Sequence, residues 1–540
     1  MARRGETPGP VEVRHPGFGG LDLSDAPRGS RPNGAQEAVD IVLAGVDQIR
    51  PRRGSERWAD PSILDGAALP IDLFAFNIQN LPIVMWGTEE GLGFMAGGVE
   101  GAHNSTIATP RTWYDFARVG SPAVQTVFVG GQGSFPVNGM VVRRYRLGLG
   151  FDSPAVSISG AAAAGDMGRA CVLGVWGPDA RLLMGGYSGT SPSGPNGLSV
   201  DQDTIVVSNP GDPTAFGTAV NPGLPIFRVG AGDGESVMGI VEFRDMAFIF
   251  KESRAWVLTG ISAGPTGAPE FHRRPFDIGY CGVPLGPGAM GAARDGVYFV
   301  TRRGVYRASG NGAPVSVSDD IESLFSAGTL TDDWSKVRLA VDGPLVIVTY
   351  PRPVLGSSGG RRGQLVYDID RKEWVNWELC AAAFGASDDK LYFVDTGRDV
   401  VTGDTGFKPA LWVMANQETD YEGSSGWSNM QQTPTRPMPV WRSVDQDFGS
   451  TAMKYIHQTK IWAEWQPTAT SGQKKLEVFT DYGNGGGQDL PGEGTVRHGY
   501  KGTRFSFRLS GRLRRITGMT HLISGQGVGD GIESDGGNSS

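Results

Sequence analysis

Apolar residues along this chain of 540 residues fall in short runs of three or four, separated by glycine, proline and acidic positions, and long helical periodicities are almost absent. The runs are rich in β-branched and aromatic side chains, which suit a pleated and packed surface. Clear runs occupy 83–86, 126–129, 205–207, 248–250, 297–300, 345–348 and 391–394. The pattern predicts an all-β fold, with short helices expected only over 35–39 and 320–325.

Several of these runs predict β-hairpins with charged turns. The run 297–300 leads through Arg302, Arg303 and Gly304 into 305–306. Gly304 accepts a positive φ at little steric cost, and the charged tip stays in water. The same succession of apolar strand, charged turn and strand with an aromatic residue recurs over 83–95, 248–258 and 364–377.

The spacing of the strands indicates a repeat. Strand starts at Ala247, Val297, Leu345 and Leu391 lie 50, 48 and 46 residues apart, and earlier runs near Ile83, Val127 and Val172 lie 44 and 45 apart. Such a period is typical of a β-propeller blade of four antiparallel strands, and closing the blades into a ring removes exposed sheet edges. The spacing predicts a propeller of about six blades over residues 65–420, with a run of β-sandwiches as the alternative.

Both ends of the chain fall outside the repeat. Residues 1–64 are extended and basic near 50–54, and residues 421–441 form a linker rich in Gly, Ser and Pro. Alternating strands resume over 442–523, which predicts a separate β domain. Residues 524–540, rich in Gly, Ser and Asp, are expected to be a flexible tail.

Composition limits the classes of function. Hydrophobic residues make up 39% of the chain, enough for a substantial core, and its 82 glycines lack the three-residue period of collagen. With 49 Lys and Arg against 57 Asp and Glu, the net charge is −8, which disfavours a dedicated nucleic-acid clamp. Arginine pairs are scattered, as expected for solvated turns and interface ion pairs, at 52–53, 143–144, 273–274, 302–303 and 514–515.

The three cysteines, Cys171, Cys281 and Cys380, lie far apart and have no CxxC spacing. Neither a disulfide framework nor a zinc knuckle is therefore expected, and buried free thiols fit assembly in a reducing cytoplasm. The N-terminus has no apolar core of a signal peptide, and no stretch approaches about 18 uninterrupted apolar residues. We expect no membrane segment.

A search for catalytic and metal-binding motifs finds no HExxH, no P-loop and no GxSxG elbow. The glycine-rich segment 91–96 resembles a dinucleotide fingerprint but lies on a predicted hairpin with no helix after it. Acidic segments at 201–203 and 445–447 and the loop 229–235 lack the pattern of an EF-hand and are expected to be turns. The six histidines are dispersed without ligand spacing, at His15, His103, His272, His457, His498 and His521.

An enzymatic propeller is an open alternative. A glycosidase needs two carboxylates facing each other across a central pocket, and 57 acidic residues always supply candidate pairs. The segment 368–374 is similar to the Asp-box turn of sialidases but lacks its full pattern, and no repeated Asp boxes occur. We therefore expect no catalytic, cofactor-binding or metal-ligating residues and no cofactor.

Short motifs in order along the chain resemble those of phage tail nozzle proteins, also called tail tubular protein B or DNA-stabilisation proteins of short-tailed phages. Near the N-terminus the motifs are FGGLD at 18–22, PNGAQEA at 32–38 and QIRPRRG at 48–54. A turn signature, SNPGDPTAF, occupies 208–216. Further motifs follow at 229–230, 233–235, 243–245, 250–252, 256–260, 279–282 and 296–299. The resemblance covers most of residues 15–325 and, weakly, the segment around 499–502.

The resemblance implies a structural virion protein without enzymatic activity. It implies a homohexameric ring beneath the head–tail adaptor at the distal end of the DNA channel, with docking sites for tail fibres or spikes. It also implies that the N- and C-terminal segments pair into a platform domain that contacts the adaptor. The same resemblance implies that the protein is located in the virion tail after assembly in the host cytoplasm.

Electrostatics suits a conduit for double-stranded DNA, because every Lys or Arg contact with phosphate adds an adhesive, salt-dependent interaction. We therefore expect positions that face the lumen to carry net negative charge, so that DNA passes without sequence-specific binding. Two alternatives are a minor tail or receptor-binding propeller of another tail type and a carbohydrate-active propeller enzyme.

Overall fold

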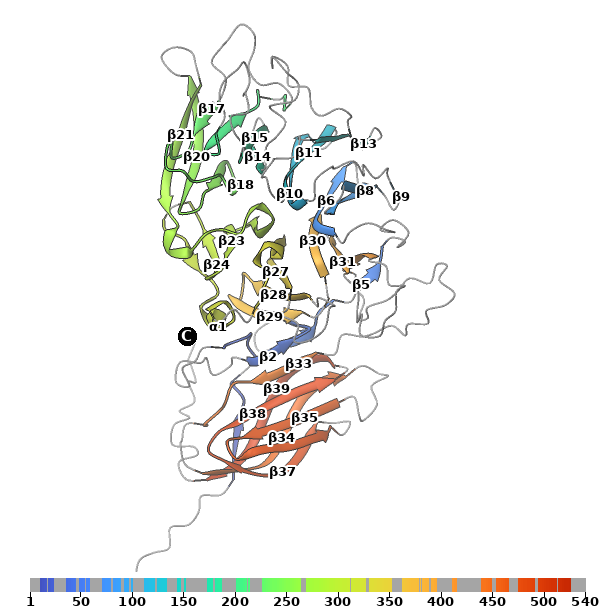
Figure 1. Cartoon of the computed structure of the whole chain (residues 1–540). Helices are drawn as coiled ribbons and strands as arrows, with labels where there is room; N and C mark the ends of the chain where they lie inside the picture. The colour runs from blue at the N-terminus through green and yellow to red at the C-terminus, as the bar shows by residue number, and fades with distance from the viewer. Residues whose placement is uncertain are drawn as a thin grey trace, which may run out of the picture. The chain divides into compact units, whose positions relative to one another are not determined.

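A computed structural model of the chain describes most of residues 10–525 (Figure 1). Segments outside the description are 1–9, 24–34, 59–69, 101–110, 134–142, 152–171, 187–200, 214–225, 352–361, 396–409, 415–438, 466–473 and 526–540, together with stretches of five residues or fewer. Strands dominate the described residues, so the predicted all-β class is confirmed. None of the helices in this part of the chain has the length and apolar character of a membrane span.

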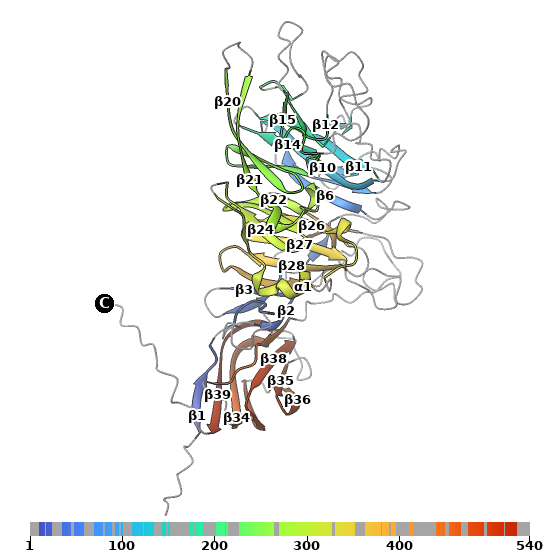
Figure 2. The same ribbon diagram turned by 60° about the vertical axis from the view of Figure 1, so that its left-hand side comes forward.

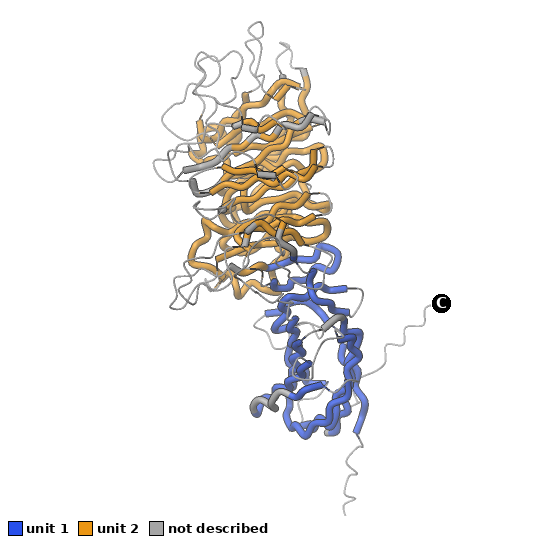
Figure 3. The backbone as a smooth tube through the Cα atoms, turned by 90° about the vertical axis from the view of Figure 1, so that its right-hand side faces the viewer, with its two compact units in different colours: residues 1–55, 365–378, 415–540 blue, residues 56–364, 379–414 orange. Residues whose placement is uncertain are grey.

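The chain divides into two compact units, drawn in blue and orange in Figure 3. Unit 1 consists of residues 1–55, 365–378 and 415–540, and unit 2 of residues 56–364 and 379–414. These limits differ from the sequence-based expectation, which started the repeat at 65. The difference arises because β5 (Ser55–Arg57) pairs as the last strand of a sheet of unit 2.

Most strands of unit 2 form a succession of four-stranded sheets, each built from strands that are mostly consecutive in the chain, and β26, β27 and β28 belong to a larger, nine-stranded sheet (Figures 1 and 2). The first two are β6 (Pro70–Ile78), β7 (Leu81–Thr88), β8 (Leu92–Ala96), β9 (Val99–Glu100), then β10 (Arg111–Ser121), β11 (Val124–Gly133), β12 (Arg143–Arg146), β13 (Gly150–Phe151). The next two are β14 (Val172–Trp176), β15 (Arg181–Gly185), β16 (Thr204–Val207), β17 (Ile226–Arg228), then β18 (Gly239–Phe243), β19 (Met246–Phe250), β20 (Arg254–Ala263), β21 (Pro269–Asp277).

The remaining strands of unit 2 continue this order. They are β22 (Met290–Ala293), β23 (Gly296–Thr301), β24 (Gly304–Ala308), β25 (Val315–Ser316), then β26 (Arg338–Asp342), β27 (Leu345–Pro351) and β28 (Arg362–Asp368), which continues past residue 364 into the segment 365–378. The last sheet is β30 (Ala381–Ser387), β31 (Lys390–Asp395), β32 (Ala410–Met414) and β5. Helical residues are few: η3 (Gly279–Cys281), η4 (Pro287–Ala289), η5 (Asp319–Ile321), α1 (Glu322–Ser326) and η6 (Trp334–Lys336).

The repeat seen in the sequence corresponds to the second strand of successive sheets. β19, β23, β27 and β31 begin at 246, 296, 345 and 390, within one residue of the predicted starts. The run near Val172 was assigned to the wrong place in the repeat, because it forms β14, the first strand of its sheet, and β15 follows as the second. The predicted turn at Gly304 connects β23 to β24 with φ of +151°.

Apolar side chains between neighbouring sheets form the core of unit 2. One cluster joins Val84 and Trp86 of β7 to Tyr392 of β31, and Trp58 packs edge-on against Tyr392 at 5.0 Å between ring centroids. Others join the β14–β17 and β18–β21 sheets, and the latter to the β22–β25 sheet. The sheets therefore pack face to face in chain order.

Unit 1 pairs strands from both ends of the chain. One sheet has the order β3 (Ile41–Leu43), β4 (Ile49–Pro51), β39 (Leu513–Gly525), β34 (Lys454–Trp465), β37 (Thr495–Gly502), with β1 (Val11–Arg14) also paired to β39. The other strands follow the order β29 (Glu373–Trp377), β2 (Ala35–Val39), β33 (Val440–Ser443), β38 (Phe505–Gly511), β35 (Lys474–Thr480), β36 (Gly483–Asp489). The expected linker, 421–441, lies mostly outside the described residues, and β39 extends one residue beyond the expected start of the tail at 524.

The prediction of a short helix over 35–39 is wrong, because this segment is strand β2. It pairs antiparallel with β33 and parallel with β29, and Ala35 and Ala38 are fully buried. Pairing and burial on both sides outweigh the weak helix propensity of a five-residue segment. The helix expected over 320–325 is confirmed, since η5 and α1 cover 319–326.

Candidate functional site

The first strands of the sheets in unit 2 surround a cavity of about 390 Å³. β6 contacts β10, β10 contacts β14, and the contacts continue through β18, β22, β26 and β30, which itself contacts β6. Each of these strands and η4 contributes residues to the cavity wall. Because side chains from all these sheets meet here, the cavity is the candidate functional site of unit 2.

A buried ion pair joins three strands at the cavity. Arg338 on β26 donates through Nε to Oδ1 of Asp72 on β6, and both side chains are less than a tenth exposed. The other carboxylate oxygen of Asp72 accepts the backbone N–H of Tyr114 on β10 over 2.6 Å. Arg338 also donates through Nη1 to the carbonyls of Ser335 and Val337, over 2.6 and 2.9 Å. Both carboxylate oxygens of Asp72 and the Nε and Nη1 groups of Arg338 thus have partners inside the protein, as buried charges require.

Asp115 on β10 forms a second connection between sheets. Its Oδ2 accepts the N–H of Leu173 on β14 over 2.8 Å, and its Oδ1 accepts the N–H of Phe116 over 3.0 Å. Burial at the cavity raises the pKa of Asp115 to about 8, the two backbone hydrogen bonds oppose this, and the charge on Asp72 adds to it.

Glu242 and Arg118 are the more exposed charged side chains of the cavity. Partial desolvation raises the pKa of Glu242 to about 7, with a smaller contribution from the charge on Asp245 and an opposing hydrogen bond from the Gly177 backbone. Glu242 therefore changes its charge near neutral pH.

The hydrogen bonds at the cavity connect strands of neighbouring sheets to one another. Both carboxylate oxygens of Asp72 and of Asp115 accept hydrogen bonds from within the protein, whereas a glycosidase leaves two carboxylates facing a substrate. Within the described part of the chain, no group of three or more His, Cys, Asp or Glu is arranged to hold a metal ion. The cavity therefore favours a structural role for these carboxylates.

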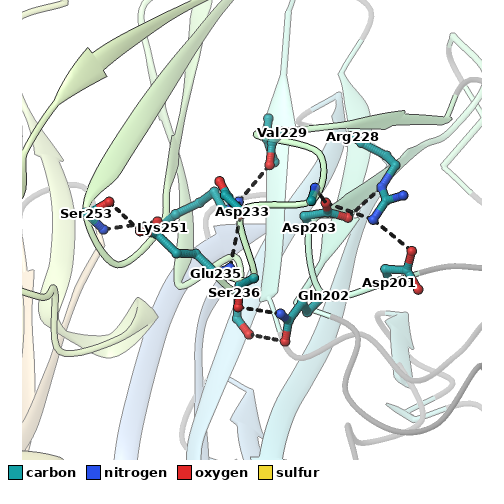
Figure 4. Close-up of polar contacts among 12 residues, drawn as sticks. Asp201, Gln202, Asp203, Arg228, Val229, Asp233, Glu235, Ser236, Lys251 and Ser253 are labelled. Atoms are coloured by element: carbon teal, nitrogen blue, oxygen red, sulfur yellow. Dashed lines mark hydrogen bonds and ion pairs between the residues drawn. The ribbon is translucent and has the colours of Figure 1, made fainter.

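The acidic segment 201–203 lies beside Arg228 in the sheet of β14–β17 (Figure 4). Arg228 donates through Nε and Nη2 to the two carboxylate oxygens of Asp203, over 2.8 and 2.9 Å, and Nη2 lies 2.8 Å from Asp201. A cation of the chain itself thus binds these two carboxylates, and the Thr204 N–H donates to the Asp201 carbonyl over 2.9 Å, as expected for a turn.

The loop 229–235 is held by a buried lysine (Figure 4). The side chain of Lys251 is fully buried, donates to the Val229 carbonyl over 2.8 Å and forms an ion pair with Asp233. Desolvation opposes ionisation of Asp233, but the hydrogen bonds from Lys251 and from the Glu235 N–H outweigh it and lower its pKa. This loop is a turn that an ion pair anchors to Lys251.

The other acidic segments from the sequence also bind within the chain. Gln446 exchanges backbone hydrogen bonds with Phe505, at 2.7 and 3.0 Å, in the segment 445–447. In the segment 368–374, the Asp368 side chain accepts the N–H of Asp370 over 2.9 Å and closes the turn between β28 and β29. Neither segment contributes residues to the cavity of unit 2.

Histidines that are far apart in the sequence come together in unit 1. His15 and His521 are almost completely buried, with ring centroids 5.9 Å apart, and His521 stacks on Phe507 at 4.0 Å. Burial, with smaller contributions from His15 and His498, holds the pKa of His521 well below its usual range. Of the other histidines, His103 lies outside the described residues.

Sequence reasoning missed the charged residues of the cavity and Lys251. A signal was present, because Asp72 and Asp115 each interrupt an apolar strand, in PIDLFAF and WYDFA. An acidic residue within such a run indicates a buried carboxylate with a specific partner. Of the cysteines, Cys281 is buried and free as expected, and Cys171 and Cys380 lie outside the described residues.

No protein-family model and no curated protein matches this chain. Solved structures that match include BBS1N in complex with ARL6DN soaked with lead, at 13% identity and a TM-score of 0.37, covering 66% of this chain and 94% of that chain. The same complex soaked with mercury matches at 11% identity and a TM-score of 0.35, covering 66% and 95%. Similarity at this level supports no inference about fold or function.

Proposed function

We propose that this chain is a structural virion protein, the tail nozzle of a short-tailed phage. The observation that carries the proposal is the combination of two units: one of successive four-stranded sheets, and one of β strands drawn from both ends of the chain. The motifs at 18–22, 48–54 and 208–216 resemble that family, which combines a propeller with a platform of paired termini.

The proposal includes a closed β-propeller of seven blades for unit 2, within one or two of the about six blades expected from spacing. Contacts that lead from β6 through the first strands and back from β30 to β6 support closure. β5, from before the first blade, pairs with β32 of the last, which is how propellers commonly join their two ends. Under this proposal the Asp72–Arg338 pair connects the first blade to the sixth.

Six copies form a ring at the distal end of the DNA channel, dock to the head–tail adaptor and carry fibres or spikes. The net charge of −8 supports a conduit, because an acidic lumen repels the phosphates of double-stranded DNA. A reconstruction of the ring with an arginine-lined bore would contradict this part of the proposal.

The carboxylate oxygens of Asp72 and Asp115 accept hydrogen bonds from Arg338 and from backbone N–H groups, which supports a role without catalysis. Sedimentation and negative-stain imaging of the purified chain test the proposal. We expect a particle of six times 57.3 kDa with six-fold averages. A chain that hydrolyses glycans, and loses this activity when Glu242 alone is changed to Gln, would instead be an enzyme.

A further inference from the structure

One face of unit 1 combines exposed aromatic rings with basic side chains. It lies on β1, β39, β34 and β37, which are adjacent in the sheet (Figure 2 labels β1, β39 and β34). Along β34 buried and exposed positions alternate, so Tyr455, Lys460 and Trp462 point away from the core. Tyr455 is 44% and Trp462 41% exposed, which is unusual for rings of this size.

Strand pairing places the basic residues beside and between the two rings. Lys501 lies opposite Tyr455, and Arg497 opposite Gln458 on β34. Lys460 and Arg14 both lie opposite Thr520 of β39, one on each side. Four exposed cations, Arg14, Lys460, Arg497 and Lys501, therefore share the described face with two exposed carboxylates, Glu12 and Glu464. We call these residues with Tyr455 and Trp462 the basic aromatic face.

Two of the cations contact the rings directly. The Lys460 ammonium lies 5.0 Å from the centroid of Trp462, and that of Lys501 lies 5.6 Å from the centroid of Tyr455. Trp462 also covers Gly518 of β39, where a Cβ would lie 3.1 Å from the ring. Trp, Tyr and Arg, all present on this face, are enriched among the residues that contribute most to protein interfaces.

The distribution of charge between the two units indicates which partner the basic aromatic face would bind. Unit 2 contains 33 Asp and Glu against 26 Lys and Arg, whereas unit 1 contains 24 against 23, which together give the 57 and 49 of the whole chain. Nearly all of the net charge of −8 therefore belongs to unit 2. Unit 2 of a second copy thus carries a net negative charge of the sign that complements the basic aromatic face.

We propose that the basic aromatic face of one copy binds the acidic unit 2 of a neighbouring copy. The two surfaces differ, so the contact is heterologous, and such contacts close into rings when the rotation between copies allows. This inference rests on the proposed ring and names the surface that builds it. Double-stranded DNA is the competing occupant, because lysines and arginines also bind phosphate.

Sedimentation of the full-length chain with substitutions on the face tests the inference. We expect Lys460→Glu combined with Lys501→Glu to weaken self-association at least about tenfold, and Trp462→Ala to weaken it by a similar factor. Lys475→Glu is the matched control, because Lys475 is an exposed lysine on β35 of the other sheet and its change should leave association intact.

Zero-length carbodiimide crosslinking identifies the partner surface. In an equal mixture of ¹⁴N- and ¹⁵N-labelled chain, we expect hybrid crosslinks from Lys460 or Lys501 to Asp or Glu of residues 56–364 or 379–414. Crosslinks only to carboxylates of unit 1 would overturn the inference. So would tight binding of a double-stranded DNA oligonucleotide that is lost in the Lys460→Glu, Lys501→Glu variant.

The failure of this inference is distinguishable from that of the proposed function. A ring that forms unchanged in all the variants would contradict the proposed role of the basic aromatic face in self-association. The nozzle proposal would be unaffected by this result. A wild-type chain that stays monomeric at high micromolar concentration would also contradict this role of the face. Gold labelling of intact particles then tests the nozzle proposal separately.

Discussion

The two units bury similar kinds of side chain but assemble them over very different distances along the chain. In unit 2 most strands pair with their nearest neighbours in sequence, as β23 does with β22 and β24. In unit 1 Val11 of β1 pairs with Ile523 of β39, and β2 pairs with β33. Unit 1 thus requires both ends of the chain before its sheets can form.

We infer from this difference that the two units have separate sources of stability. Pairings between distant segments carry a high cost of loop closure and form slowly, whereas local hairpins form first. We therefore expect unit 2 to fold on its own strands, and unit 1 to depend on a few residues that hold the termini together. The following predictions test that division, from the largest effect to the smallest.

Deletion of residues 1–23 should unfold unit 1 and leave unit 2 folded. The deletion removes β1, which exposes the edge of β39, and removes His15 and Phe18, whose rings contact Trp441 at 5.3 and 4.8 Å. Hydrogen exchange read by mass spectrometry should show loss of protection in 440–525 and none in 239–350. Equal loss in both units would show that they form one cooperative structure.

Arg338→Met should have the opposite effect to the N-terminal deletion: it should destabilise unit 2 and leave unit 1 folded. The substitution leaves Asp72 buried without its cation, which typically costs about 3–5 kcal/mol. Chemical denaturation followed by hydrogen exchange gives the free energy of unfolding for each unit. Lys336→Met, which removes an exposed pair with Asp333, is the control and should cost less than about 1 kcal/mol.

The two units should respond to pH with opposite signs. In unit 1 the unfolded state binds protons below about pH 6.5 that folded His521 does not, so stability falls as pH decreases through this range. In unit 2 folded Asp115 keeps its proton up to about pH 8 while the unfolded carboxyl loses it near 3.8, so stability falls as pH rises between these values.

Each proton contributes a slope of up to about 1.4 kcal/mol per pH unit. Hydrogen exchange of the two units at a series of pH values measures the slopes. His521→Gln should flatten the slope of unit 1, and Asp115→Asn that of unit 2. A change of the same sign in both wild-type units would contradict the assignment.

Gly230→Ala should cost more stability than Gly232→Ala, by about 1–2 kcal/mol. Both glycines have positive φ, +66° and +82°, so both substitutions strain the backbone. Only at Gly230 does a Cβ meet the Asp233 carboxylate and the Lys251 ammonium, whereas nothing lies within 4 Å at Gly232. Thermal unfolding of the two variants measures the difference, and equal costs would exclude the steric part of the argument.

The strands and hairpins of unit 2 were predictable because their pairing is local and their spacing repeats. β19, β23, β27 and β31 follow from runs of Val, Ile, Phe and Tyr between charged turns. The partners of β2 and of Asp72 were not predictable, because they lie hundreds of residues away and no local pattern encodes them. A segment such as AQEAV reads as helix until its neighbours in the sheet are known.

The most direct test of the proposed nozzle is negative-stain imaging of intact particles that carry gold on this protein. Gold at the distal end of a short tail, in a ring around the channel axis, is the result that the proposal predicts. Gold on the capsid shell or the fibres, or particles that assemble with complete tails when the chain is missing, would contradict it.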